Sequence, residues 1–268
     1  MNERKSGEQC SQTDRYSRQT AFAPLGEAGQ QRLQQGRALV VGCGALGGTI
    51  ATILVRAGVG RDGGCVALID PDTVRLSNLH RQTSFTEDDV RCNRFKVEAA
   101  RKALSAADEK ANIETIAVRF DENNAEMVAD FDILIDATDD FSTRFLMNRA
   151  AVKYRKPFVT AGVAGASGQI LTVLPGETAC LECFLDPKDN SATVVVPVLP
   201  PLPQLFAALE AMEAIKILSG HAETVDRSLF AVDLWENRFR RFDLKRNENC
   251  PVCGNDRLTV GRSTELSR

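Results

Sequence analysis

Short apolar runs alternate along most of this chain with longer segments whose apolar residues recur at helical spacing. The short runs predict buried strands, and the longer periodic segments predict helices. The predicted strands are Ala38–Gly42, Cys65–Ile69, Asn112–Val118, Phe131–Asp136, Pro157–Gly162 and Gln169–Leu174, and the predicted helices include Ile50–Val59, Asn93–Ala107 and Ser142–Tyr154. This alternation predicts an α/β fold with a doubly wound, mostly parallel, Rossmann-like sheet.

The pattern changes in the C-terminal part of the chain. The proline-rich stretch Asp186–Gln204 predicts a crossing loop. The helix predicted over Leu205–Ser219 carries an apolar stripe that we expect to face the core or a second subunit. The stripe consists of Leu205, Leu209, Met212, Ile215 and Leu218. Two further strands, Ser228–Leu234 and Arg238–Leu244, are so close in sequence that they predict an antiparallel hairpin.

Charge and composition narrow the class of protein. The net charge of −3 and the sequence pI of about 5.6 argue against a general nucleic-acid-binding protein. No apolar run reaches the roughly 18 residues that a membrane-spanning helix needs, and the polar N-terminus lacks the hydrophobic segment of a signal peptide. We expect a cytoplasmic protein, whose eight cysteines serve as metal ligands or working thiols before disulfides.

A glycine-rich turn follows the first predicted strand. In the sequence GCGALG, Gly42 permits a tight turn, Gly44 lets the backbone approach a phosphate, and Gly47 lets the next helix pack on the sheet. The helix N-terminus offers free N–H groups to an anion. Asp70, 23 residues after Gly47, stands where a carboxylate binds ribose hydroxyls. A turn kept only for packing is the alternative, but this strand, helix, strand and Asp context favours a nucleotide site.

Polar and cationic residues follow the second predicted strand. The loop after Asp70 contains Asn78, His80 and Arg81, and Lys96 stands near the start of the next predicted helix. This loop lies at the carboxyl edge of the sheet, where ligands bind in open α/β sheets. Cations beside a phosphate turn suit a triphosphate better than a nicotinamide dinucleotide. We interpret His80 as a loop residue, because the chain contains only one other histidine.

Three acidic residues stand at the end of the fourth predicted strand: Asp136, Asp139 and Asp140. Helix capping explains one of them, because Asp is favoured at the first turn of a helix. Three acids are more than a cap requires, and Mg²⁺ prefers carboxylate oxygen beside phosphate oxygen. We therefore expect Asp139 to bind Mg²⁺.

Two CxxC pairs lie far apart in the sequence. Cys180 and Cys183 form one, and Cys250 and Cys253 form the other, with 66 residues between them. Four thiolates form a closed tetrahedral zinc site of the structural kind, which would tie the C-terminal part back to the domain. A redox dithiol is the competing interpretation. We interpret the remaining cysteines as packing or surface thiols: Cys10, Cys43, Cys65 and Cys92.

The domain organisation follows from these features. We expect residues 1–14 to form a disordered leader, residues 15–254 to form one domain, and residues 255–268 to form a tail. The nucleotide-binding half would span about 15–165, and the crossing loop with the zinc-tied part about 166–254. Arg15 and Arg18 lie on one predicted helix face, and their spacing alone favours a solvated basic surface.

The motifs together resemble a known family. RYSRQ, GCGALGG, LVRAGVG, LIDPDTVRLSNLHRQ, NRFKVEAA, DATDDFSTRF and CxxC…CPVC follow one another from about Arg15 to Gly254. In this they are similar to the ThiF/MoeB/HesA adenylyltransferases, which are related to ubiquitin-activating enzymes. The resemblance implies an enzyme that activates a carboxylate with ATP and Mg²⁺ to give an acyl-adenylate and pyrophosphate. It also implies a homodimer acting on the C-terminal glycine of a ubiquitin-like sulfur carrier.

The resemblance also implies roles for single residues. The nucleotide would be held by Gly42, Gly44, Gly47 and Asp70, the phosphates by Asn78, Arg81 and Lys96, and Mg²⁺ by Asp139. Arg18 would reach the nucleotide of the partner subunit, against the solvated surface that its spacing favours. Arg81, Lys96, Asp139 and Arg18 would thus be catalytic, because fixed cations and a metal offset the repulsion between a carboxylate and a phosphate.

Three departures from the family pattern stand out. Asp140 replaces a common Asn, His80 replaces a common Gln or Asn, and the crossing loop Asp186–Gln204 has no cysteine to form a covalent link to a carrier. We therefore expect the reaction to stop at the acyl-adenylate. Adenylation of a small-molecule or peptide carboxylate, a nucleotide-binding scaffold without turnover and a nicotinamide-dependent dehydrogenase remain alternatives. The last would leave the catalytic cations and Asp139 without a purpose.

Overall fold

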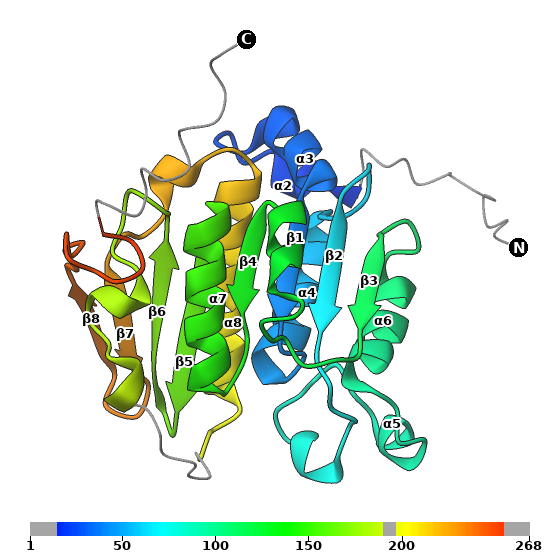
Figure 1. Cartoon of the computed structure of the whole chain (residues 1–268). Helices are drawn as coiled ribbons and strands as arrows, with labels where there is room; N and C mark the ends of the chain where they lie inside the picture. Colours follow the sequence, from blue (N-terminus) through cyan, green and yellow to red (C-terminus); the bar gives the residue numbers. More distant parts are fainter. Residues whose placement is uncertain (1–14, 190–196, 255–268) are drawn as a thin grey trace, which may run out of the picture.

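The computed structural model describes residues 15–189 and 197–254, in which eight strands form one mixed sheet (Figure 1). The strand order is β3-β2-β1-β4-β5-β6-β7-β8. The strands are β1 (Arg37–Val41), β2 (Cys65–Ile69), β3 (Ile113–Ile116), β4 (Ile133–Asp136), β5 (Phe158–Ala164), β6 (Ser167–Val173), β7 (Leu229–Asp233) and β8 (Arg238–Phe242). Strands β1 to β5 pair in parallel and β6 to β8 pair antiparallel, which confirms the predicted fold class.

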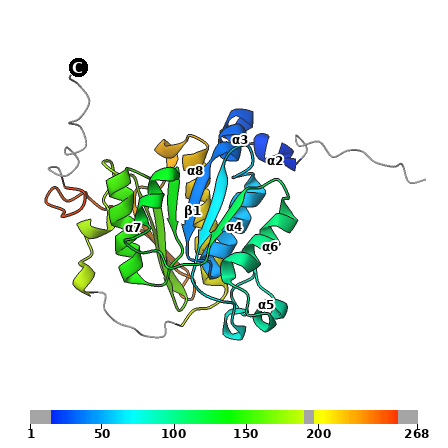
Figure 2. The same cartoon turned by 45° about the vertical axis from the view of Figure 1, so that its right-hand side comes forward.

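Helices cover both faces of the sheet (Figure 1 and Figure 2). One face is covered by α3 (Gly26–Gln35), α4 (Ala45–Ala57), α6 (Lys96–Ala107) and α8 (Pro201–Leu218), and the other by α7 (Phe141–Tyr154) with the 3₁₀ turn η2 (Ala125–Asp130). The remaining short elements are α2 (Ser17–Thr20), α5 (Glu87–Arg91), η1 (Leu76–Asn78), η3 (Leu181–Cys183), η4 (Pro187–Asp189) and η5 (Ala222–Thr224). No helix in the described ranges has both the length and the apolar character that a membrane crossing requires.

The side-chain alternation of β1 divides the interior into two cores. Val40 packs with the side chains of α4 and α8, whereas Leu39 and Val41 pack on the opposite face with those of α7. The central strands are buried on both faces, which is why they read as unbroken apolar runs. Strand β1 lies between β2 and β4, so the chain changes winding direction there and leaves a crevice at the carboxyl ends of the strands.

Two predicted helix boundaries are wrong. The helix predicted from Asn93 begins at Lys96, because Asn93 has a positive φ of 47° and the residues before Lys96 do not continue a helix. Helix α8 begins at Pro201, inside the predicted crossing loop. Proline lacks an N–H, but the first helical turn needs none, so this proline-rich segment starts a helix instead of forming a loop.

The buried face of α8 also differs from the prediction. Of the predicted stripe, Leu218 is buried but Met212 is 52 % exposed. Leu205, Leu209 and Ile215 are only partly buried. The buried face consists of Leu202, Phe206, Ala207, Glu210, Ala211 and Ala214. Apolar residues occur on every side of this helix, so their spacing does not identify the core face. A subunit interface on the outer face stays a prediction.

Candidate active site

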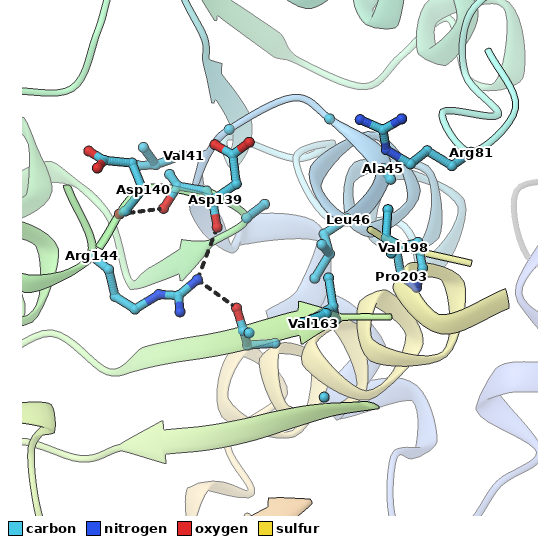
Figure 3. Close-up of a pocket in the computed structure, with 18 of the residues that line it drawn as sticks. Val41, Ala45, Leu46, Arg81, Asp139, Asp140, Arg144, Val163, Val198 and Pro203 are labelled. Atoms are coloured by element: carbon cyan, nitrogen blue, oxygen red, sulfur yellow. Dashed lines mark hydrogen bonds between the residues drawn. The ribbon is translucent and has the colours of Figure 1, made fainter. Parts of the chain in front are cut away.

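A cleft of about 1170 Å³ lies along the carboxyl edge of the parallel strands and extends over β5 to β8. Six of the predicted nucleotide-site residues line it: Gly42, Gly44, Asp70, Asn78, Arg81 and Lys96. Asp139 lines it as well. In Figure 3, Arg81 lies on one side and Asp139 on the other, with Ala45 at the start of α4 between them. Gly47 and Arg18 do not line the cleft.

Each glycine of the turn has a different steric environment. Gly42 has a φ of +92°, and a Cβ there would lie 2.5 Å from the carbonyl oxygen of Ala137. A Cβ on Gly47 would lie 1.9 Å from the carbonyl oxygen of Gly42, so only glycine fits beneath the turn. A Cβ on Gly44 would meet only the Nε2 atom of Gln82, at 3.5 Å. Gly42 and Gly47 thus build the turn, while Gly44 leaves free space toward the cleft.

Asp70 fixes the turn to strand β2. Its Oδ2 atom accepts a hydrogen bond from the N–H of Cys43 at 2.7 Å, and Oδ1 accepts one from the N–H of Asp72 at 2.8 Å. Burial raises the pKa of the Asp70 carboxyl, while Lys96, 3.9 Å away, acts in the opposite direction. The carboxyl group therefore holds the backbone of the turn, and its contact with a ribose stays a prediction.

The cations of the site come from two neighbouring segments. Lys96 donates from Nζ to Asp72 at 2.7 Å at the start of α6. Arg81 donates to the carbonyl oxygen of Ser77 at 3.1 Å, so its position is fixed by the loop that contains η1. Gln204 of α8 donates to the carbonyl oxygen of Arg81 at 3.1 Å. Helix α8 therefore holds this loop at the edge of the cleft.

The three acids after β4 have separate environments. Asp140 caps α7, with its carboxylate accepting from the N–H of Thr143 at 3.0 Å. Partial burial acts to raise the pKa of Asp140, but hydrogen bonds from Ser142 and Thr143 outweigh it and lower the pKa to about 2. Asp136 is fully buried and accepts from Arg144 at 2.6 Å. Asp139 is exposed and makes no side-chain hydrogen bond or ion pair with any described residue.

Three side chains at or beneath the cleft were not predicted from the sequence. Arg144 of α7 is 7 % exposed and lines the cleft. Gln82 lines it too, and its buried Oε1 atom has no partner in the described chain. Glu210 of α8 is fully buried, neither of its oxygens has a described partner, and burial raises its pKa well above the ordinary value. A charged residue inside the apolar segment of α8 was the available signal for Glu210.

The four CxxC cysteines converge away from the cleft. The Sγ atoms of Cys180 and Cys250 lie 3.6 Å apart, and those of Cys183 and Cys253 lie 3.3 Å apart. All four ligand atoms lie within 4.8 Å of one another, near the spacing of about 3.8 Å for sulfurs around tetrahedral zinc. Burial raises the pKa of Cys183 to about 11, and a bound metal ion would favour the thiolate form of its ligands. The cysteines are free, and their convergence favours a metal over a redox dithiol.

The described structure of one chain does not bring Arg18 to the cleft. It lies on α2, at the edge of the sheet opposite the carboxyl ends of the parallel strands (Figure 1). Arg15 pairs with Asp108 at 3.5 Å. Arg18 is exposed and has no hydrogen-bond or ion-pair partner among the described residues. The two arginines therefore differ, although their spacing predicted one common surface.

The fold and the cleft define a nucleotide-dependent enzyme of the doubly wound α/β class. The model of the ThiF family matches residues 16–252. This chain belongs to the ThiF family, and it is an adenylyltransferase.

Relatives support the assignment. The sulfur carrier protein ThiS adenylyltransferase of Bacillus subtilis is 39 % identical over 90 % of this chain and 72 % of its own length. The sulfur carrier protein adenylyltransferase of Thermus thermophilus is 37 % identical over 91 % of each chain. The crystal structure of Escherichia coli MccB with ATP superposes with a TM-score of 0.78 at 26 % identity, covering 90 % of this chain and 74 % of that one.

Proposed function

We propose that this enzyme uses ATP to adenylate the C-terminal glycine carboxylate of a ubiquitin-like sulfur carrier, releasing pyrophosphate. The observation that carries the proposal is the arrangement at the carboxyl edge. The glycine turn, the cations Arg81 and Lys96, and the unpaired carboxylate of Asp139 all line one cleft. The names of the bacterial relatives, which specify sulfur carrier adenylyltransferases, support the choice of substrate.

The residues of the cleft would act mainly through charge and position. A carboxylate that attacks the α-phosphate brings two anions together, so the barrier falls when fixed cations offset the repulsion. Arg81 and Lys96 would take this role, and the free N–H groups at the start of α4 would bind phosphate oxygens. Holding both reactants in line supplies much of the remaining rate increase. No side chain is needed as a general acid or base.

Asp139 fits the role of a magnesium ligand. It offers an exposed carboxylate that no described residue engages, and hard carboxylate oxygen is the ligand that Mg²⁺ prefers beside phosphates. When bound, Mg²⁺ would offset charge on the phosphates. The four cysteines would hold zinc in a closed, structural site. That site would join the segment after β8 to η3 and α7.

The available thiols support a reaction that ends at the acyl-adenylate. Cys43 and Cys65 are buried, and burial raises the pKa of Cys65 to about 12. Cys92 is exposed at the end of α5, and Cys10 lies outside the described residues. None of these belongs to the crossing loop, so an external sulfur or amine nucleophile would complete the transfer in the cytoplasm.

Carboxylate-dependent exchange of pyrophosphate into ATP tests the proposal. The substrate is a small ubiquitin-fold protein ending in Gly-Gly, preferably one encoded beside this chain, and the control is the same protein with a C-terminal amide. We expect exchange with the free carboxylate and none with the amide. Exchange that depends instead on a short peptide or a small acid would favour the second candidate, which rests on the unusual crossing loop. Exchange with neither class would reject adenylation.

Arg18 would complete the site of a partner subunit, because its own chain does not bring it to the cleft. Each of the variants Arg18→Ala and Asp139→Ala would then be inactive alone. Mixed after subunit exchange, they should recover part of the activity, because a mixed dimer contains one site with both native groups. Proof of exchange comes from mass spectrometry of differently tagged subunits. If activity stays absent in verified mixed dimers, Arg18 does not act across a subunit interface.

A further inference from the structure

The guanidinium of Arg144 lies at the floor of the cleft with only part of its donors used. Nε donates to Asp136 at 2.6 Å. Nη2 donates to the carbonyl oxygens of Thr138 and Ala161, both at 2.9 Å (Figure 3). Arginine has five N–H groups, and these bonds use three. Nη1 makes no hydrogen bond with any residue in the described ranges, although the side chain is held on both other nitrogens.

Nη1 faces an open part of the cleft above Gly162. A Cβ on Gly162 would have one neighbour within 4 Å, the Nη1 atom itself at 3.1 Å. Both residues line the cleft. The unused donors therefore have room in front of them because position 162 has no side chain.

Uncharged residues, two of them small, lie beside this space across the sheet, and the row ends at Arg240 of β8. Gly162 of β5 pairs with Gln169 of β6, and Gln169 pairs with Ala231 of β7. All three line the cleft. Side chains directly opposite one another lie on the same face of a sheet, so this row forms a track that leads to Arg144. An extended chain end with small side chains would fit along it.

The charge around Arg144 leaves it able to bind an anion. Asp136 balances the guanidinium, and both groups are buried. Glu210 approaches the same cluster from α8, and burial raises the pKa of its carboxyl well above the ordinary value. The ion pair of Arg144 and Asp136 is itself neutral, and the Nη1 donors, unused among the described residues, stay available to a carboxylate that arrives at Gly162.

We propose that Nη1 of Arg144 binds an oxygen of the substrate's terminal carboxylate and holds the other oxygen toward the α-phosphate of ATP. This proposal rests on the proposed function and makes Arg144 the residue that distinguishes a free chain end from an amide. A neutral amide cannot form this charge-assisted hydrogen bond, and the loss lowers the affinity for the substrate about ten- to hundredfold. Because Nε and Nη2 are fixed by protein acceptors, Nη1 is held in position before the substrate binds.

Gly162→Ala tests the proposal while keeping the Arg144 side chain, whose Nη1 atom would have to shift slightly to admit the new methyl group. The glycine does not have a positive φ, so alanine fits the backbone, and its methyl group occupies the space in front of Nη1. The experiment measures binding of the Gly-Gly-ending carrier and of its C-terminal amide by calorimetry in the presence of a non-hydrolysable ATP analogue. We expect the wild type to prefer the carboxylate at least tenfold and Gly162→Ala to lose that preference, with unchanged affinity for the ATP analogue.

Two further variants keep the result interpretable. Arg144→Lys retains a cation beside Asp136 but lacks Nη1, and it should lose the same preference. Ala164→Ser adds one atom to the same face of β5, two residues away, and should keep the preference. This control shows whether the effect of Gly162→Ala comes from blocking Nη1 or only from added bulk in the row of residues.

The outcomes separate the two proposals. If the wild type prefers the carboxylate and the variants Gly162→Ala and Arg144→Lys keep that preference, the role of Arg144 is overturned. The proposed adenylation is not affected by that result. A raised dissociation constant for the ATP analogue alone also overturns the role of Arg144, because Nη1 would then bind nucleotide. A wild type without any preference for the carboxylate rejects both the role of Arg144 and the proposed substrate.

Discussion

At one end of the cleft Lys96 and Asp70 are held by neighbouring groups, whereas over β5 the cleft has a glycine beside a guanidinium with donors unused in the described chain. Lys96 pairs with Asp72, and Asp70 holds the N–H of Cys43. Over β5 to β8 the cleft is lined by Gly162, Gln169 and Ala231 and by the two arginines Arg238 and Arg240. The first end is built to fix the position of a compact, highly charged ligand. The second has open space over Gly162 and several cationic side chains, of which Arg144 is held in place by protein acceptors.

This difference predicts where a single substitution acts. At the end formed by the glycine turn, Asp70 and Lys96, residues that hold the structure and residues that face the ligand stand side by side in the same short segments. Some substitutions there should therefore destabilise the turn, and others should only weaken ligand binding. At the open end, Gly162→Ala should change substrate affinity with little change in stability, whereas substitution of the buried Arg144 also disturbs its ion pair with Asp136.

The largest effect should come from Asp139→Ala. Its carboxylate makes no hydrogen bond or ion pair in the described chain, so the variant should unfold at the temperature of the wild type. Without the metal ion, the transition state loses several kcal/mol of stabilisation of its phosphate charge. The rate of ATP–pyrophosphate exchange should therefore fall by orders of magnitude. Near-normal exchange at saturating Mg²⁺ would refute the assignment of Asp139.

Two glycines of the turn provide a matched pair. Gly47→Ala places a Cβ 1.9 Å from the carbonyl oxygen of Gly42, and such overpacking reduces the free energy of unfolding by about 1–3 kcal/mol or more. Gly44→Ala meets only Gln82, at 3.5 Å, so the fold should persist while the methyl group obstructs phosphate binding. Thermal unfolding and nucleotide titration separate the two. Equal stability of both variants would contradict the steric roles assigned here.

The cysteine site lies away from the cleft and should affect stability first. Metal analysis of protein purified without chelator should find about one zinc per chain. Cys250→Ser should lose the metal and reduce the free energy of unfolding by at least about 2 kcal/mol, because binding to a structural site contributes to folding. Cys92→Ser is the control, since Cys92 is exposed and separate from the cluster. Absence of metal from the native protein would leave the redox dithiol interpretation.

The sequence predicted the residues at the glycine-turn end of the cleft but not the arginine at the open end. Gly42, Asp70 and Asp139 could be placed from the sequence because each stands within three residues of the end of a buried parallel strand. The carboxyl ends of such strands meet at one edge. Arg144 could not be placed in this way. Its role depends on the buried Asp136 and on the open space over Gly162, and a sequence does not state which buried charges meet.

The errors at α8 and α6 have local causes. The prolines before Leu202 indicated a loop, but the same residues fit the first turn of a helix. Apolar residues around all sides of α8 concealed which face is buried, and Glu210 lies on that face. Asn93 carries a positive φ, which asparagine tolerates better than most residues, so the expected start of α6 was three residues early.

The smallest effect should come from Asp140→Asn, next to the position with the largest. Asparagine caps helices about as well as aspartate, and it keeps an oxygen that accepts from the N–H of Thr143. The loss of negative charge at the N-terminus of α7 should reduce the free energy of unfolding by only about 0.3–1 kcal/mol at pH 7. Exchange activity should remain of the same order as that of the wild type, because Asp140 is committed to the cap and Asp139 is not.

The pH dependence of stability isolates the charge of Asp140. Its pKa is lowered to about 2 in the folded protein and is about 3.9 in the unfolded chain. A lowered pKa means that its stabilisation is complete above about pH 4 and is lost as the pH falls toward 2. The wild type should therefore lose its advantage over Asp140→Asn across this window when unfolding is measured in urea. If Asp140→Asn instead abolishes exchange at neutral pH, the two adjacent acids share the metal, and the division between cap and ligand is wrong.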